Sequence, residues 1–331
     1  MLNSPQNAIN QCPCQRHPDI GTMLLSLSKP PFDCMDTDAP AAISAINAAL
    51  DAAVLEQHLG DLVADREMVD VTTSTNADLL ARARQRAPAR PVLRVARRQT
   101  QGRGRRGRSW HGSDAGSLLF SLALPWGRDA AASASVTLAC GIEAAAAVQE
   151  CLPANTRVLV KWPNDLLLNG GKLAGILVEL ADDTQGARTL VIGMGINLCS
   201  DIALRDRIAG DRAKSEPSSA AVAVADLASV LGNAAVLSQR EIWLARLARA
   251  LLTAAQRYEH NGFAGGPAAF GACCAYRDAV VEAYGAGGPV ITGILRGVDS
   301  EGRLLLESSG ALRPLNSGEI SLRSPDSGGA Q

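Results

Sequence analysis

The chain has 331 residues, of which 47% are hydrophobic and 20% charged, close to the averages for a soluble globular protein. This length is typical of about two domains, and the composition excludes a disordered chain, a collagen-like fibre and a small disulfide-stapled domain. Basic and acidic residues nearly cancel, at 32 against 33, so the whole molecule is not an electrostatic binder of nucleic acid or membranes.

Hydrophobic runs and cysteine usage indicate the cellular compartment of the protein. No run reaches the roughly 18 apolar residues that cross a bilayer, and the N-terminal residues lack the pattern of a secretory signal. The eight cysteines are scattered along the chain, which favours the reducing cytoplasm. Cys12 and Cys14 form a C-x-C without a second pair, so we expect no metal site there.

The pattern of apolar residues predicts an α+β fold. Six prolines predict a flexible tail over residues 1–40, and Ser74 or Thr75 is expected to cap a helix that contains Leu79 and Leu80. Further helices are predicted over Ala41–Leu62, Ser133–Cys151, Ala220–Leu231 and Ile242–Tyr258, and strands over Val92–Ala96, Leu118–Leu124, Val158–Val160, Leu166–Leu168, Leu173–Leu180 and Leu190–Gly193.

Near Cys273 the sequence pattern changes to short predicted β segments separated by Gly turns. The strands predicted there are Ala279–Tyr284, Val290–Gly297, Leu304–Glu307 and Leu312–Leu315. At some fifty residues this region fits a small β-barrel. We therefore expect a mixed central domain over residues 41–270, a barrel over 273–325 and a disordered end over 326–331.

The loop from Gly102 to Arg108 matches the G-x-G-x-x-G pattern of dinucleotide-binding sites by letter. That pattern needs a helix opening directly from the loop, whereas Ser109–Ser113 continues in loop character, so we exclude this interpretation. Glycine lets backbone N–H groups approach an anion, and arginine supplies a planar, permanently charged donor. The loop predicts an anion site, and a basic surface touching nucleic acid is the alternative that composition leaves open.

Three further clusters combine polar residues with strand ends: KWPND over Lys161–Asp165, GGKLAGILVE over Gly170–Glu179 and GMGIN over Gly193–Asn197. Each is ordinary when taken alone. Proline followed by an Asx turn is common in loops, a lysine at a strand mouth often lies along the surface, and two glycines mark a close approach of backbones.

In order and spacing, these clusters, together with Ser74-Thr75-Asn76 and GEISLR over Gly318–Arg323, resemble the biotin protein ligase family over roughly residues 50–325. The resemblance implies a catalytic domain with the class II aminoacyl-tRNA synthetase fold, followed by an SH3-like barrel. It implies that ATP activates biotin to biotinyl-5′-AMP with release of pyrophosphate, and that biotin then passes to one lysine of a biotin carboxyl carrier protein. Joining two anions needs positioning and charge neutralisation, and Mg²⁺ is expected to bridge the phosphates.

The resemblance also assigns roles to residues. The biotin site is expected to comprise Ser74, Thr75, Asn76, Gln99, Arg103, Gly104, Arg105 and Lys172. The nucleotide site is expected to comprise Arg103, Arg105, Lys161, Asn164, Asn197 and Arg323, with no metal ligands from the protein. Arg105, Lys172 and Asp165 are expected to be catalytic: Lys172 would meet the carboxylyl-phosphate oxygens, and Asp165 would lie near the incoming acceptor lysine. Thr73 departs from the family, which often has Asp there.

Two alternatives belong to other functions. A nucleic-acid regulator could use Arg82–Arg108, which holds eleven arginines and no acidic residue, but this stretch lacks an aromatic stacking platform. A lipoate or octanoyl transferase would share the fold, and the Arg-rich loop favours biotin. Residues 1–40 are too irregular for the winged helix of bifunctional family members. We therefore expect a cytoplasmic, monofunctional ligase, monomeric or homodimeric, without specific DNA binding or membrane association.

Overall fold

We describe a computed structural model of the chain over residues 50–114, 116–128, 133–215, 223–285, 290–316 and 320–323. The tail predicted over residues 1–40 and the end predicted over 326–331 lie outside these ranges. Part of the helix predicted over Ala41–Leu62 also lies outside them. Its described part is helix α2 (Ala52–Leu59), which Asp51 caps by accepting from the N–H groups of Ala53 and Val54, followed by a 3₁₀ turn over Gly60–Leu62.

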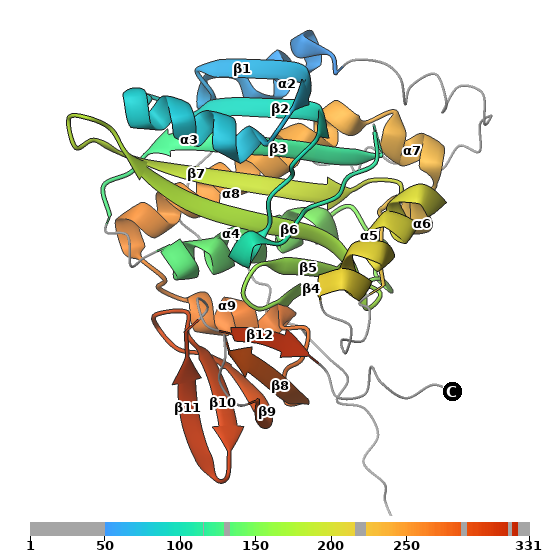
Figure 1. Cartoon of the computed structure of the whole chain (residues 1–331), viewed down its shortest axis with the longest axis vertical. Helices are drawn as coiled ribbons and strands as arrows, with labels where there is room; N and C mark the ends of the chain where they lie inside the picture. The colour runs from blue at the N-terminus through green and yellow to red at the C-terminus, as the bar shows by residue number, and fades with distance from the viewer. Residues whose placement is uncertain are drawn as a thin grey trace, which may run out of the picture. The chain divides into compact units, whose positions relative to one another are not determined.

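A seven-stranded mixed sheet carries most of the larger domain (Figure 1). Its strand order is β1-β2-β3-β7-β6-β5-β4; β1 pairs with β2 in parallel, and the other neighbours are antiparallel. The strands are β1 (Asp65–Thr72), β2 (Val92–Gln99), β3 (Ser117–Pro125), β4 (Val158–Lys161), β5 (Asp165–Leu168), β6 (Gly171–Asp182) and β7 (Arg188–Asn197). The central strands β3 and β7 are buried almost along their whole length, because helices cover both faces of the sheet.

Helix α3 (Thr75–Gln85) crosses one face of the sheet, and α4 (Ser133–Gln149) and α8 (Arg240–Asn261) lie behind the other (Figure 1). The apolar side of α3 presents Leu79, Leu80 and Ala83 to Ala123 and Val191 of the sheet. Ser74 caps α3 with its hydroxyl toward the N–H of Ala77, as the sequence predicts. This cap fixes where the helix begins and brings its first turn over the sheet.

The remaining helices are α5 (Ile202–Ser215), α6 (Ala228–Leu231), α7 (Asn233–Leu237) and α9 (Gly266–Cys273). The prediction of a helix over Ala220–Leu231 is wrong for residues 223–227, and its first three residues lie outside the described ranges. Val224 instead forms a parallel β-bridge with Lys172, whose N–H donates to Ala223 O at 2.6 Å. Backbone pairing beside β6 outweighs the helical propensity of this alanine-rich segment.

The C-terminal region forms a five-stranded antiparallel sheet in the order β11-β10-β9-β8-β12. Its strands are β8 (Val280–Gly285), β9 (Ile291–Val298), β10 (Leu304–Ser308), β11 (Ala311–Leu315) and β12 (Ile320–Arg323). Two contacts tie it to the large domain: the Trp162 indole N–H donates to Gly302 O at 3.1 Å, and the Ala275 N–H donates to Val160 O at 3.0 Å. Among the described residues, no helix combines the length and apolarity needed to cross a membrane.

Candidate active site

A pocket lies where α3, the loop after β2 and the start of β6 meet on the sheet. Most of the predicted site residues line it, namely Ser74, Thr75, Asn76, Gln99, Arg103, Gly104, Arg105, Lys161, Asn164, Asp165 and Lys172. They come from segments up to about a hundred residues apart in the sequence. The fold therefore brings together side chains that the sequence offered only as separate motifs.

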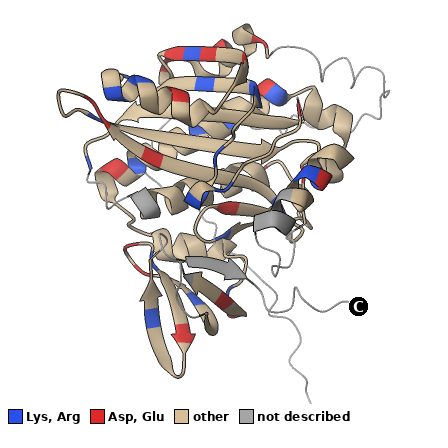
Figure 2. Cartoon of the chain, in the orientation of Figure 1, with Lys and Arg blue, Asp and Glu red and all other residues tan. Residues whose placement is uncertain are grey.

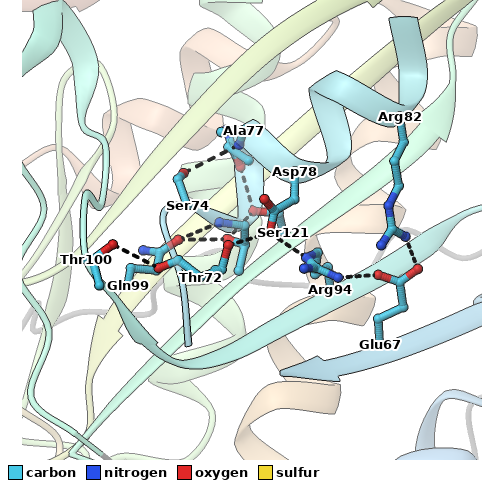
Figure 3. A network of polar contacts seen from close by, with 12 residues as sticks. Glu67, Thr72, Ser74, Ala77, Asp78, Arg82, Arg94, Gln99, Thr100 and Ser121 are labelled. Carbon is cyan, nitrogen blue, oxygen red and sulfur yellow. Dashed lines mark hydrogen bonds and ion pairs between the residues drawn. The ribbon is translucent and has the colours of Figure 1, made fainter. Parts of the chain in front are cut away.

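Part of the pocket lining is a floor of hydroxyl and amide groups, and Figure 3 shows Ser74, Gln99 and Ser121 of this floor within a network of polar contacts. Gln99 Oε1 accepts from the Thr75 N–H at 2.7 Å and lies 3.0 Å from Thr75 Oγ1. Ser121 Oγ lies 2.7 Å from Thr75 Oγ1 and donates to Asn76 Oδ1 at 2.6 Å. Thr75, Asn76 and Ser121 are almost fully buried, so this polar floor is pre-organised to pair with a polar ligand group.

Four arginines and two lysines also line the pocket: Arg103, Arg105, Arg106, Arg108, Lys161 and Lys172. Arg105 sits half-buried in a short 3₁₀ turn of the loop after β2. Burial lowers the pKa of Arg105, the carboxylate of Asp165 raises it, and the adjacent arginines lower it again. A guanidinium stays charged even so, and its partial desolvation strengthens any bond it makes to an anion.

A β-bulge aims Lys172 into the pocket. Asp165 pairs with Gly175 and Leu167 pairs with Lys172, so the register shifts by one residue between these pairs. Without the bulge, simple alternation would place Lys172 on the opposite face of β6 from Gly175. With it, Lys172 Nζ lies 2.8 Å from Asp165 Oδ1 and 5.3 Å from the centre of the Trp110 ring.

Glycines on β6 and β7 make room for side chains that lie flat on the sheet. A Cβ at Gly195 would lie 2.3 Å from the Trp110 indole, and a Cβ at Gly193 would lie 2.2 Å from Asn76 Oδ1. Gly175 would meet the other edge of Trp110 at 3.0 Å. The glycines of the GMGIN motif are therefore required by the close approach of Trp110 and Asn76.

Two predicted nucleotide-site residues stand apart from the pocket lining. Asn197 is 3% exposed, and its Nδ2 donates to Lys172 O at 3.4 Å and Ala225 O at 3.1 Å. It therefore ties the segment around Ala225 to β6 beside Lys172, and its predicted nucleotide contact stays a prediction. The backbone of Arg323 pairs with Glu282 in the C-terminal sheet, but its side chain lies outside what the structure describes.

Comparison with known proteins gives two family matches. Residues 68–197 match the biotin/lipoate A/B protein ligase family, and residues 281–323 match the biotin protein ligase C-terminal domain. The bifunctional ligase/repressor BirA of Salmonella typhimurium is 36% identical over 232 residues, which cover 70% of this chain and 67% of BirA. The chain belongs to the biotin protein ligase family.

A second relative and a solved structure agree with this assignment. The biotin–[acetyl-CoA-carboxylase] ligase of Paracoccus denitrificans is 43% identical over 134 residues, 40% of this chain and 53% of that protein. The biotin protein ligase of Aquifex aeolicus, in complex with biotin and ATP, has a TM-score of 0.58 at 22% identity, covering 79% of this chain and 98% of that one. The predicted ligase activity class and the α+β fold with a class II synthetase-like catalytic domain are confirmed.

Several residues of this ligase pocket have no role in the sequence prediction. Trp110, Ser121 and Trp162 line the pocket, and Glu179 holds Asn76 and Arg103 from outside its lining. Ser121 could have been found from the sequence, because a hydroxyl in the middle of a buried, mostly apolar strand needs a hydrogen-bond partner. Glu179 ends the GGKLAGILVE motif, yet its contacts with Asn76 and Arg103 depend on the tertiary structure.

Four arginines of the run over Arg82–Arg108 pair with carboxylates in the ligase fold, namely Arg82, Arg94, Arg97 and Arg103. Arg94 contacts Glu67 at 2.6 Å and Asp78 at 2.7 Å, and Arg97 contacts Asp70 at 3.1 Å. Figure 2 shows basic and acidic residues interspersed over the large sheet and its helices in that view. The local excess of positive charge in the sequence is therefore partly neutralised by acidic residues from elsewhere in the fold.

Proposed function

We propose that this chain activates biotin with ATP to biotinyl-5′-AMP, releasing pyrophosphate, and then transfers biotin to a lysine of a biotin carboxyl carrier protein. The observation that carries the proposal is a single pocket whose lining combines a neutral hydrogen-bonding floor with a cluster of cations. Biotin has matching ends, a cyclic urea and a carboxylate. The named activities of BirA and of the Paracoccus ligase, and the biotin and ATP held by the Aquifex protein, support it.

In the first step, the pocket holds two anions together. The floor around Thr75 and Gln99 binds the ureido ring, which leaves the biotin carboxylate toward Arg103, Arg105 and Lys172. The carboxylate oxygen attacks the α-phosphorus and the bond to pyrophosphate breaks. Preorganised cations lower the cost of the charge that develops, typically by about 3–4 kcal/mol for one well-placed group.

In the second step, the amine of the acceptor lysine attacks the acyl carbon and AMP leaves. Asp165 is the carboxylate of the described pocket lining, and it is positioned by Lys172. We assign it the task of orienting the acceptor ammonium and accepting its proton through water or directly. A cationic side chain approaching this pair would exchange for Lys172 at the same oxygen.

The donor set of the pocket fits a Mg²⁺ ion that arrives with the nucleotide. Its described lining offers one carboxylate, Asp165, and no group of three or more His, Cys, Asp or Glu able to hold a metal occurs among the described residues. Mg²⁺ commonly keeps waters and phosphate oxygens and takes one or two carboxylates from the protein. When bound, it would neutralise phosphate charge, and Asp165 would hold it through a water, so that the protein supplies no direct metal ligand, as expected from the sequence.

The test is biotin-dependent exchange of pyrophosphate into ATP, with lipoate as the competing acid. We expect exchange with biotin, none above background with lipoate, and a bound adenylate detected by mass spectrometry after incubation with biotin, ATP and Mg²⁺. Exchange with lipoate alone would replace this proposal by lipoate activation. A gel shift with the promoter of the cell's biotin operon should show no specific binding, as a monofunctional ligase requires.

A further inference from the structure

Glu179 on β6 lies between the pocket floor and the Arg-rich loop. Its Oε2 accepts from Asn76 Nδ2 at 3.0 Å, and its Oε1 accepts from Arg103 Nη2 at 3.0 Å. We propose that Glu179 is a positioning residue that fixes the direction of the hydrogen bonds in the pocket floor, so that the floor accepts N–H donors from a bound cyclic urea. The proposal rests on the biotin activation proposed above.

The direction of the floor follows from counting hydrogens. Asn76 Nδ2 donates to Glu179 and to Leu177 O at 3.3 Å, which turns Asn76 Oδ1 toward Ser121. The single hydroxyl hydrogen of Ser121 is then committed to Asn76, because an amide oxygen only accepts. Toward Thr75 and toward a ligand, Ser121 Oγ can act only as an acceptor.

Thr75 is restricted in the same way from its other side. Its backbone N–H requires Gln99 to present Oε1, so Thr75 Oγ1 shares one hydrogen between Gln99 Oε1 and Ser121 Oγ. Neither hydroxyl keeps a hydrogen to point into the pocket. The floor therefore offers lone pairs, which suit the two ring N–H groups of a cyclic urea.

Only a carboxylate of this length satisfies both neighbours of Glu179. Asn76 and Arg103 both donate, so both oxygens must accept. A glutamine at this position would face one of the two with its NH₂ group. If it faces Asn76, the Asn76 amide turns over, its Nδ2 reaches Ser121, and the Ser121 hydrogen is released into the floor, where it opposes a ligand N–H.

The experiment compares wild type, Glu179→Gln, Ser121→Ala and the double variant by pyrophosphate exchange. Asp182→Asn is the matched control, because Asp182 is a carboxylate on the same strand that also pairs with an arginine but does not line the pocket. For Glu179→Gln we expect the KM for biotin to rise about ten-fold, equivalent to one oriented hydrogen bond. The KM for ATP and the kcat should stay near wild type, and Asp182→Asn should match wild type.

The double variant decides whether Glu179 acts through the floor. Once Ser121 is alanine, there is no hydroxyl to redirect, so adding Glu179→Gln should raise the biotin KM by less than about two-fold further. If the increases in biotin KM of the two single variants multiply in the double variant, or if the loss is confined to kcat or to the KM for ATP, Glu179 acts through Arg103 rather than through the floor. Either result overturns the proposal. An unchanged biotin KM in Glu179→Gln overturns it too. Wild type that exchanges nothing with biotin refutes the proposed function itself, a separate outcome.

Discussion

Replacing Gly195 by alanine should disturb the site through Trp110. The new Cβ would lie 2.3 Å from two atoms of the indole, whereas carbon contacts are most favourable at about 3.5–4.0 Å. The ring must therefore move by about 1.2 Å or more. Overpacking of this kind typically costs about 1–3 kcal/mol of unfolding free energy.

The displacement should also reach the catalytic loop. The backbone N–H of Trp110 donates to Gly102 O at 2.8 Å, so a shift of the Trp110 backbone that accommodates the displaced indole pulls on the segment that carries Arg103 and Arg105. Lys172 would lose its place over the ring as well. A misplacement of about 1 Å can cost on the order of a hundred-fold in rate, so we expect pyrophosphate exchange to fall by about that factor.

Urea unfolding and pyrophosphate exchange together test this reasoning. Gly141→Ala is the control: its Cβ would meet Val160 at an ordinary 3.6 Å inside α4, and alanine should stabilise the helix by up to about 1 kcal/mol. In a Trp110→Ala background the penalty of Gly195→Ala should largely disappear. An equal penalty in both backgrounds, or a Gly195→Ala enzyme indistinguishable from wild type, would show that the indole contact is not the cause.

Three further outcomes are expected. Lys172→Ala should lower adenylate formation by about 10²–10³-fold while leaving the fold intact by circular dichroism, and exchange at the wild-type rate would contradict its assigned role. Arg105→Gly should release the adenylate about ten- to a hundred-fold faster, so streptavidin blots should reveal label on added serum albumin, which wild type leaves unlabelled. Burial opposes ionisation of Glu67, but hydrogen bonds from two arginines lower its pKa below the ordinary 4.5. The stability that it adds should be present above that pH and lost in more acidic solution, and Glu67→Gln should weaken this acid dependence of urea unfolding.

The sequence predicts most of the pocket residues because they lie in contiguous motifs. It does not predict isolated residues whose contacts join different helices, strands and loops. Regular alternation along β6 would place Lys172 on the same face as Ile176. Only the bulge opposite Leu167 turns the Lys172 side chain to the pocket face. Strand β1 is missed because it is a half-exposed edge without a clean apolar alternation. The role of Trp110 becomes clear only from the structure, in which its indole packs against the glycines of β6 and β7.

The bond between Trp162 and the C-terminal sheet has a consequence for how the protein melts. Trp162 is 2% exposed and lines the pocket, while its indole N–H is satisfied by Gly302, in a turn that Asp299 holds through the N–H groups of Glu301 and Arg303. Opening the C-terminal sheet alone would break this bond and leave a buried donor unpaired, at a cost of about 1–3 kcal/mol. The described domains should therefore lose their structure in one cooperative transition, and a shortened enzyme that ends before the second sheet should not keep an ordered pocket.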